Sequence, residues 1–153
     1  MSKDIYESPL ASRYASKYML HLFSDDSRYQ TWRRLWTALA RAQCQLGLPI
    51  TEAQVAELEA HITDIDYDVA AQREREVRHD VMAHIYAFGV DAPGAKGIIH
   101  LGATSCYVGD NTDVIIMREG LQLVRKKVIG VLANLAKFAD EYKTMPCLAY
   151  THC

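Results

Sequence analysis

The feature that most constrains the fold is an apolar repeat in the second half of the chain. From Val114 to Tyr142, apolar residues recur every three or four positions without a miss, an average spacing near 3.5 residues. This spacing predicts one α-helix of about 44 Å that packs along one face, since a helix rises 1.5 Å per residue. The repeat consists of Val114, Met117, Leu121, Val124, Val128, Val131, Leu135, Phe138 and Tyr142.

A helix this long needs more than one neighbour, and Ile115, Ile116 and Leu132 widen its apolar stripe further. The rest of the chain supplies too few comparable helices to cover it, which favours a truncated helical bundle or an oligomer interface. We therefore expect an all-α protein with an N-terminal helical domain over 1–103. The first long helix of a truncated central bundle would follow over 104–153.

Four shorter helices are expected before the long one. Helical spacing and capping residues predict helices over 24–46, 51–61, 64–78 and 79–88, and the third and fourth are either separate or one helix bent near residue 78. Residues 1–23 show no clear apolar period, so we expect them to form an irregular arm. Sheet content should be close to nil.

Composition excludes several classes of function. The chain has 17 Lys and Arg against 19 Asp and Glu, a net charge of −2, and its basic residues form no long block. This argues against nucleic-acid binding. No stretch resembles a cleaved leader or reaches the roughly 18 apolar residues of a membrane span. The four cysteines match no zinc or redox spacing. We expect a soluble, cytoplasmic protein without membrane association.

A cluster of ionisable residues opens the fourth predicted helix. Arg78, His79 and Asp80 stand at its start, where an anionic ligand would meet a cation, an imidazole and the helix terminus. The alternative is an ordinary helix cap with a surface ion pair. A metal site is rejected, because His79 and His84 are five residues apart and would lie about 140° apart around a helix.

The segment from Gly97 to Asp113 combines glycines, small polar residues and capping side chains before the long helix. Helix-start N–H groups together with the hydroxyls of Thr104 and Ser105 would bind carboxylate or phosphate oxygens without a metal. Alternatively, this segment simply begins the helix. Gly102 and Gly109 argue for more than capping, because glycine lets a backbone approach a ligand closely.

One more histidine, His152, follows a proline in an apolar and aromatic stretch at the end of the chain. Such a residue is commonly a packed histidine. If it lines a site, its ordinary pKa near 6.5 suits a general acid that works near neutral pH.

Four motifs stand in order along the chain: Ser8 to Tyr14, Arg78 to His84, His100 to Ser105 with Asp110 to Asp113, and Tyr150 to His152. Together they resemble the adenylosuccinate lyases of the animal type, which belong to the fumarase and argininosuccinate lyase superfamily. The resemblance implies all-α homotetramers built around a central bundle of long helices, which agrees with the uncovered stripe.

The resemblance also implies an activity: elimination of fumarate from adenylosuccinate to give AMP, and from the ribotide SAICAR to give AICAR, without a cofactor. His152 would be the general acid that protonates the departing nitrogen. Of the substrate-binding residues it implies, Arg13 and Tyr14 would contact the phosphate end, Arg78, His79 and Asp80 would bind substrate, and Thr104 and Ser105 would hold a succinyl carboxylate.

The chain departs from the family pattern at its end. It stops at Cys153, and the flexible loop that carries the family's catalytic serine base is absent. We therefore expect these residues to be an N-terminal fragment that is inactive by itself, because the loop with the catalytic base is missing. Since family sites draw residues from three subunits, the part present here would bind ligand only weakly. The alternative is a non-catalytic helical assembly module whose 114–142 stripe pairs with partner helices.

Overall fold

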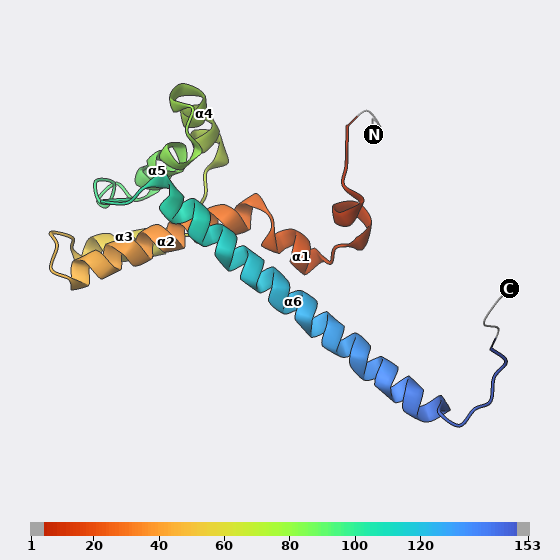
Figure 1. Cartoon of the computed structure of the whole chain (residues 1–153). Helices are drawn as coiled ribbons and strands as arrows, with labels where there is room; N and C mark the ends of the chain where they lie inside the picture. The colour runs from red at the N-terminus through yellow and green to blue at the C-terminus, as the bar shows by residue number, and fades with distance from the viewer. Residues whose placement is uncertain (1–4, 150–153) are drawn as a thin grey trace. The chain divides into compact units, whose positions relative to one another are not determined.

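The computed structural model describes residues 5–149, and these residues form helices, turns and extended segments with no β-strand. The expected all-α class is confirmed. Figure 1 shows the helices in chain order. They are the π-helical turn η1 (Leu10–Tyr14) and the α-helices α1 (Lys17–Leu22), α2 (Asp25–Gln45), α3 (Glu52–Ala60), α4 (Tyr67–Val77), α5 (Asp80–Asp91) and α6 (Ser105–Tyr142).

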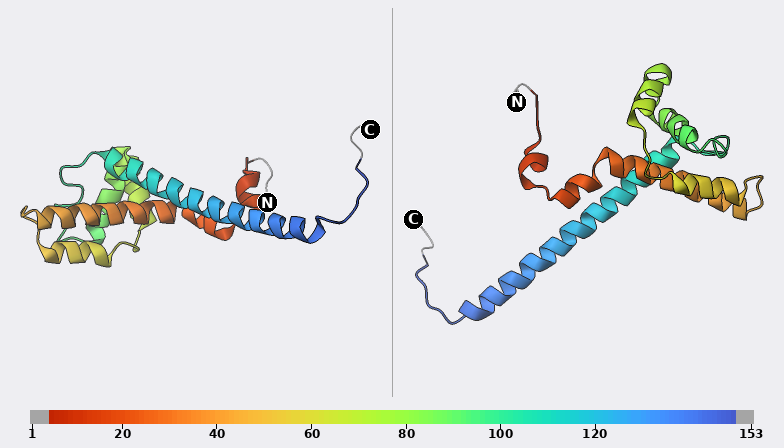
Figure 2. Two further views of the ribbon diagram at one scale, coloured as in Figure 1. Left: turned by 60° about the horizontal axis from the view of Figure 1, so that its bottom comes forward. Right: turned by 180° about the vertical axis from the view of Figure 1, so that it is seen from behind.

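Local capping chemistry sets the starts of α2 and α3. The side chain of Ser24 accepts a hydrogen bond from the backbone N–H of Ser27 at 3.3 Å. Thr51 and Gln54 form a reciprocal capping box, in which each side chain accepts from the other's backbone N–H. Between the two helices Gly47 adopts a φ of +82°, a conformation that favours glycine. The chain therefore turns back, and α3 lies antiparallel beside α2 (Figure 2).

Helices α4 and α5 are separate, which settles the alternative that the sequence left open. Asp66 caps α4 by accepting from the N–H groups of Asp68 and Val69, both at 3.0 Å. Arg78 then ends the helix in the left-handed conformation, with a φ of 52°. Since this conformation breaks helical continuity, α5 starts in a new direction at Asp80.

The expectation of an irregular arm was wrong for residues 10–22. The arm contains η1 and the six-residue helix α1, whose cap Ser16 accepts from the N–H of Met19 at 3.2 Å. Helix α1 buries only Leu22. A helix this short with one buried side chain leaves no apolar period in the sequence, so capping was its only local signal.

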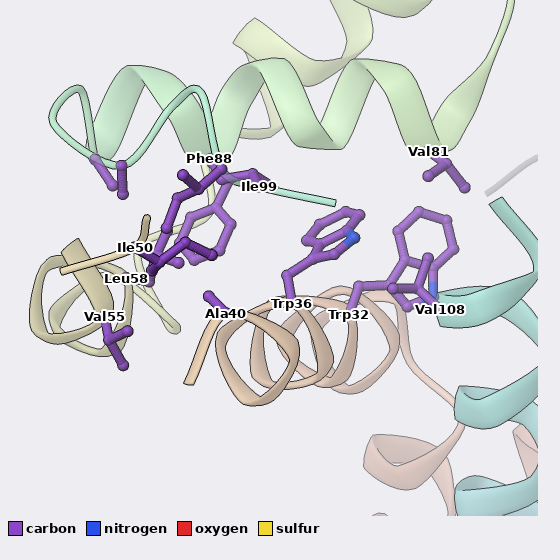
Figure 3. Packing of buried hydrophobic residues seen from close by; sticks show 13 residues of the cluster. Trp32, Trp36, Ala40, Ile50, Val55, Leu58, Val81, Phe88, Ile99 and Val108 are labelled. Carbon is purple, nitrogen blue, oxygen red and sulfur yellow. The ribbon is translucent and has the colours of Figure 1, made fainter. Parts of the chain in front are cut away.

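The core forms where α2 meets α3, α5, the turn after α5 and the first turns of α6 (Figure 3). Trp32 and Trp36, one turn apart on α2, are 3% and 1% exposed. Trp36 packs near Phe88 with ring centroids 6.2 Å apart, and Trp32 lies beside Val108 of α6. The other buried apolar members are Ala40, Ile50, Val55, Leu58, Val81, Ala92, Ala95, Ile98 and Ile99.

A buried guanidinium ties these elements together. Arg33 of α2 is 1% exposed and donates to Asp91 at the end of α5 at 2.8 Å. It also donates to the carbonyl oxygens of His61 and Asp64, and its guanidinium carbon lies 4.5 Å from the centroid of the Phe88 ring. Burial lowers the pKa of Arg33, and the bond to Asp91 opposes that shift. One side chain thus joins α2, α5 and the segment between α3 and α4.

The structure divides into two compact units between Ile116 and Met117. Helix α6 is 38 residues long, because the segment that begins at Ser105 is already helical. In the second unit most apolar side chains of α6 are exposed. No helix among the described residues is long and apolar enough to cross a membrane. The proposed division into 1–103 and 104–153 stays a prediction.

The Arg33 network makes a stability prediction. Arg33→Met should lower the free energy of unfolding by about 3–5 kcal/mol, because it leaves Asp91 and two carbonyl oxygens without their partner. Arg34→Met is the matched control, since Arg34 is exposed and should change stability by about 0.5 kcal/mol or less. Urea unfolding followed by circular dichroism measures both. Equal losses in the two variants would contradict the role of the buried guanidinium.

Candidate functional site

A cleft of about 240 Å³ opens where α2, the start of α5 and the first turns of α6 come together. It contains three residues expected from the sequence to form a site, His79, Asp80 and Ser105. Residues of both expected motifs, far apart in the chain, thus border one cavity. The full lining is Arg28, Trp32, His79, Asp80, Val81, Ser105, Cys106, Gly109, Asp110 and Asp113.

The start of α5 presents an imidazole and a carboxylate to the cleft. His79 occupies the N-cap position with extended backbone, a φ of −151°, and its side chain makes no capping bond. Its Nδ1 lies 3.5 Å from Oδ1 of Asp80, which also accepts from the N–H of Val81 at 2.7 Å. Both side chains are about half exposed. Asp80 can therefore orient the ring while the ring stays accessible to a ligand.

The first turns of α6 also line the cleft. Ser105 is the first helical residue, so the backbone N–H groups there belong to a helix start. Gly109 lies inside the helix, and a side chain there would meet nothing within 4 Å. The Gly109 backbone is therefore open on this face. Gly102, just before the helix, has a φ of +72° and shapes the entry turn.

The charges of the cleft do not by themselves favour an anion. Asp80, Asp110 and Asp113 face one guanidinium, Arg28, and the His79 imidazole. Arg28 Nη2 lies 4.0 Å from Asp113 Oδ1, and both side chains are at least half exposed, so this ion pair is weak. A ligand with several negative charges would need cations beyond those that line the cleft.

The floor of the cleft holds an unused donor. Trp32 borders the cleft, yet its indole N–H is buried and makes no hydrogen bond with residues 5–149. A buried donor without a partner lowers the stability of a fold by about 1–3 kcal/mol. In Trp32 this donor belongs to a residue that lines the cleft. The sequence pattern assigned Trp32 to the core only, because its spacing from Trp36 is helical.

Other residues expected at the site do not line this cleft. Arg13 and Tyr14 lie on η1, where the guanidinium carbon of Arg13 is 5.5 Å from the centroid of the Tyr14 ring. Arg78 forms the turn between α4 and α5, and the Thr104 carbonyl accepts from the N–H of Tyr107 at 2.9 Å. His152 lies outside the described residues. The assignment of these residues to a substrate site stays a prediction.

Sequence reasoning missed Arg28, and it singled out Asp110 and Asp113 only within a longer motif. A signal for them existed. Arg28 and Trp32 are four residues apart on α2, and Asp110 and Asp113 are three apart on α6, so each pair shares a helix face. Which face meets the cleft depends on how the helices pack, and local sequence does not specify that.

Two histidines near the site have structural partners. His100, with a φ of 66°, accepts at Nδ1 from the indole N–H of Trp36 at 3.0 Å. Burial, and then the charge of His79, lower the pKa of His100. His84 is 5% exposed and stacks on Tyr29 with ring centroids 3.7 Å apart. His84 and His79 therefore lie in different environments, and the described residues hold no cluster of three or more acidic, His or Cys side chains suited to a metal.

Known proteins that are similar to this chain share one name. Adenylosuccinate lyases from Schizosaccharomyces pombe and Saccharomyces cerevisiae are each 49% identical to the chain and cover 96% and 97% of it. The adenylosuccinate lyase of Schistosoma mansoni is 45% identical over 96% of it. The chain spans about a third of the length of these relatives. No protein-family model matches it.

Similarity over nearly the whole chain, together with the all-helical fold, relates this protein to a family of carbon–nitrogen lyases. These relatives are adenylosuccinate lyases, and the resemblance noted in the sequence motifs is thereby confirmed.

The buried histidine behind the cleft makes a pH prediction. Burial, helped by the Arg33 charge, lowers the pKa of His84 from 6.5 to about 4. Between these two pH values the unfolded chain therefore binds more protons than the folded chain. The free energy of unfolding is highest above pH 6.5 and falls as the pH falls toward 4, by roughly 3 kcal/mol.

Unfolding free energies measured at intervals from pH 4 to pH 7 test this. His84→Phe keeps an aromatic ring against Tyr29 but removes the titrating group. Its stability should depend less steeply on pH over this interval than that of the unaltered chain. Parallel curves for the two proteins would contradict the assignment, whatever the offset between them.

Proposed function

We propose that this chain contributes part of the active site of an enzyme that eliminates fumarate from adenylosuccinate, giving AMP, and from SAICAR, giving AICAR. The observation that carries the proposal is the convergence of His79, Asp80 and Ser105 on one cleft. These residues come from two motifs of the family resemblance that are about 25 positions apart. The relatives that match the chain carry the name of this activity.

The chemistry of the elimination suits such a cleft. Removal of a proton from the carbon beside a carboxylate pushes negative charge onto that carboxylate. The hydroxyl of Ser105 and the N–H groups at the start of α6 would stabilise this charge, as preorganised donors do in oxyanion holes. Thr104 would assist, and Arg78, His79 and Asp80 would bind the substrate.

The departing nitrogen needs a proton as its bond to carbon breaks. We assign this step to His152 as the general acid, a role worth roughly 10²- to 10⁴-fold in rate when the acid is well placed. Arg13 and Tyr14 would contact the phosphate end. No cofactor is needed, since the proton transfers and charge stabilisation account for the elimination.

The acidic excess in the cleft suggests that the site is completed by other groups. Asp80, Asp110 and Asp113 outnumber the cations there, whereas the substrate carries two carboxylates and a phosphate. We infer that cations from other parts of a homotetramer would face this cleft in the whole enzyme. That enzyme would act in the cytoplasm.

A second candidate is a helical assembly module without catalysis. The exposed apolar face of α6 after Met117 favours it, because such faces usually pack against other helices. In this case His79 and Ser105 would serve only the helix starts. The two candidates differ in whether the cleft binds a dicarboxylic nucleotide.

Calorimetric titration of the purified chain with adenylosuccinate separates them. We expect weak binding that Ser105→Ala and His79→Ala each weaken about fivefold, the equivalent of one lost hydrogen bond near 1 kcal/mol. Ser27→Ala is a matched control, a helix-start serine outside the cleft lining. Binding that is unchanged in both cleft variants would favour the assembly module.

The chain by itself should release no fumarate from adenylosuccinate. It spans about a third of the length of its relatives and holds only part of the proposed machinery. The absorbance of fumarate, followed with micromolar chain and excess substrate, measures this. Turnover above the uncatalysed rate that disappears in His152→Ala would show that the chain alone is sufficient, contrary to this proposal.

A further inference from the structure

A second cleft, of about 430 Å³, lies between α4, α5 and the turn that follows α5. Only His79 lines both clefts, so the second is a separate cavity next to the first. Its floor is apolar, with Met82 48% and Tyr86 38% exposed. The volume is in the range of small-molecule sites. The lining residues are Arg73, Val77, His79, Met82, Ile85, Tyr86 and Lys96.

Two cations from different elements converge on one aromatic ring of this cleft. The guanidinium carbon of Arg73, on α4, lies 5.0 Å from the centroid of Tyr86, and Nζ of Lys96, in the turn after α5, lies 5.2 Å from it. Each distance is within the range of a cation–π contact. The Tyr86 ring therefore holds two positive groups at the edge of an apolar floor.

The missing side chain at Gly89 makes room for Lys96. Gly89 lies inside α5, where glycine is less favourable than alanine by about 1 kcal/mol. A Cβ at Gly89 would lie 2.7 Å from Cγ of Lys96, so the lysine stem occupies the space that any other residue would fill. The absence of a side chain at Gly89 thus lets Lys96 lie against the helix and reach Tyr86.

The cations of this cleft are incompletely neutralised. Arg73 pairs with Glu76 at 2.7 Å, whereas Lys96 makes no ion pair with any residue from 5 to 149. Glu76 balances the charge of Arg73, so the positive charge of Lys96 is the one left without a nearby opposite charge in the described part of the chain.

We propose that this cleft binds a small organic anion with a flat apolar body. The body would lie on Met82, Ile85 and Tyr86, and a carboxylate or phosphate would meet Lys96 and Arg73. The cation and ring positions carry this inference, and it does not depend on lyase activity. The anion's phosphate or carboxylate would form charge-assisted hydrogen bonds, which are stronger than neutral ones.

Phenyl phosphate is a suitable probe, and the methyl group of Met82, observed by NMR in chain labelled at methionine methyl carbons, is the reporter. We expect a saturable shift of the Met82 signal. Inorganic phosphate and benzyl alcohol, which each carry half of the proposed chemistry, should bind at least about fivefold more weakly. Equal affinity for either fragment, or no saturable shift, would overturn the proposal.

Substitutions test whether phenyl phosphate binds in the second cleft. Lys96→Gln should weaken phenyl phosphate binding about fivefold, whereas Arg34→Gln, an equal charge change at an exposed site outside the cleft, should not. Ser105→Ala alters the first cleft only and should leave binding unchanged. Loss of binding in Ser105→Ala, or wild-type binding in Lys96→Gln, would place the anion elsewhere and overturn the proposal.

Gly89→Ala tests the position of the Lys96 side chain without changing the charge of the cleft. It should weaken binding because the added Cβ displaces the Lys96 stem, while the helix itself gains about 1 kcal/mol of propensity. Gly130→Ala, in α6 with open space around the added methyl group, is the matched control. Wild-type affinity in Gly89→Ala would show that anion binding does not depend on Lys96 lying against Gly89, and would contradict the proposal.

Discussion

The buried Arg33 guanidinium is the interaction on which the arrangement of the first unit most depends. Hydrophobic contacts alone would let α5 slide along α2, because apolar surfaces impose little direction. The bond from Arg33 to Asp91 and the two bonds to the carbonyl oxygens after α3 have fixed geometry. They fix the far end of α5 relative to α2. The start of the same rigid helix, which carries His79 and Asp80, is thereby placed beside Arg28.

The tryptophan pair links this core to the cleft. Trp36 lies within the apolar cluster and holds His100 through its indole N–H, while Trp32, one turn earlier, borders the cleft. The turn that leads into α6 is therefore anchored to the same face of α2 that forms the cleft floor. A change in packing at Trp36 would reach Ser105 through this turn, which makes the core part of the site's geometry.

The sequence predicted most of the fold because its signals were local. The period of α6 and the capping box at Thr51 act over a few residues, and the helices follow them. Helix α1 was missed because one buried side chain makes no period. For the candidate cleft, motifs singled out His79, Asp80 and Ser105, and their role in a site stays a prediction. Arg28 was not found, because only the packing of α2 against α5 and α6 brings it to the cleft.

The two clefts differ in charge, and the difference follows from which helix faces meet. The first gathers three carboxylates from α5 and α6 around Arg28 and His79, whereas the second gathers Arg73 and Lys96 around an apolar floor. His79 stands between them and lines both. An anion in the first cleft would therefore meet three carboxylates, whereas an anion in the second would meet two cations.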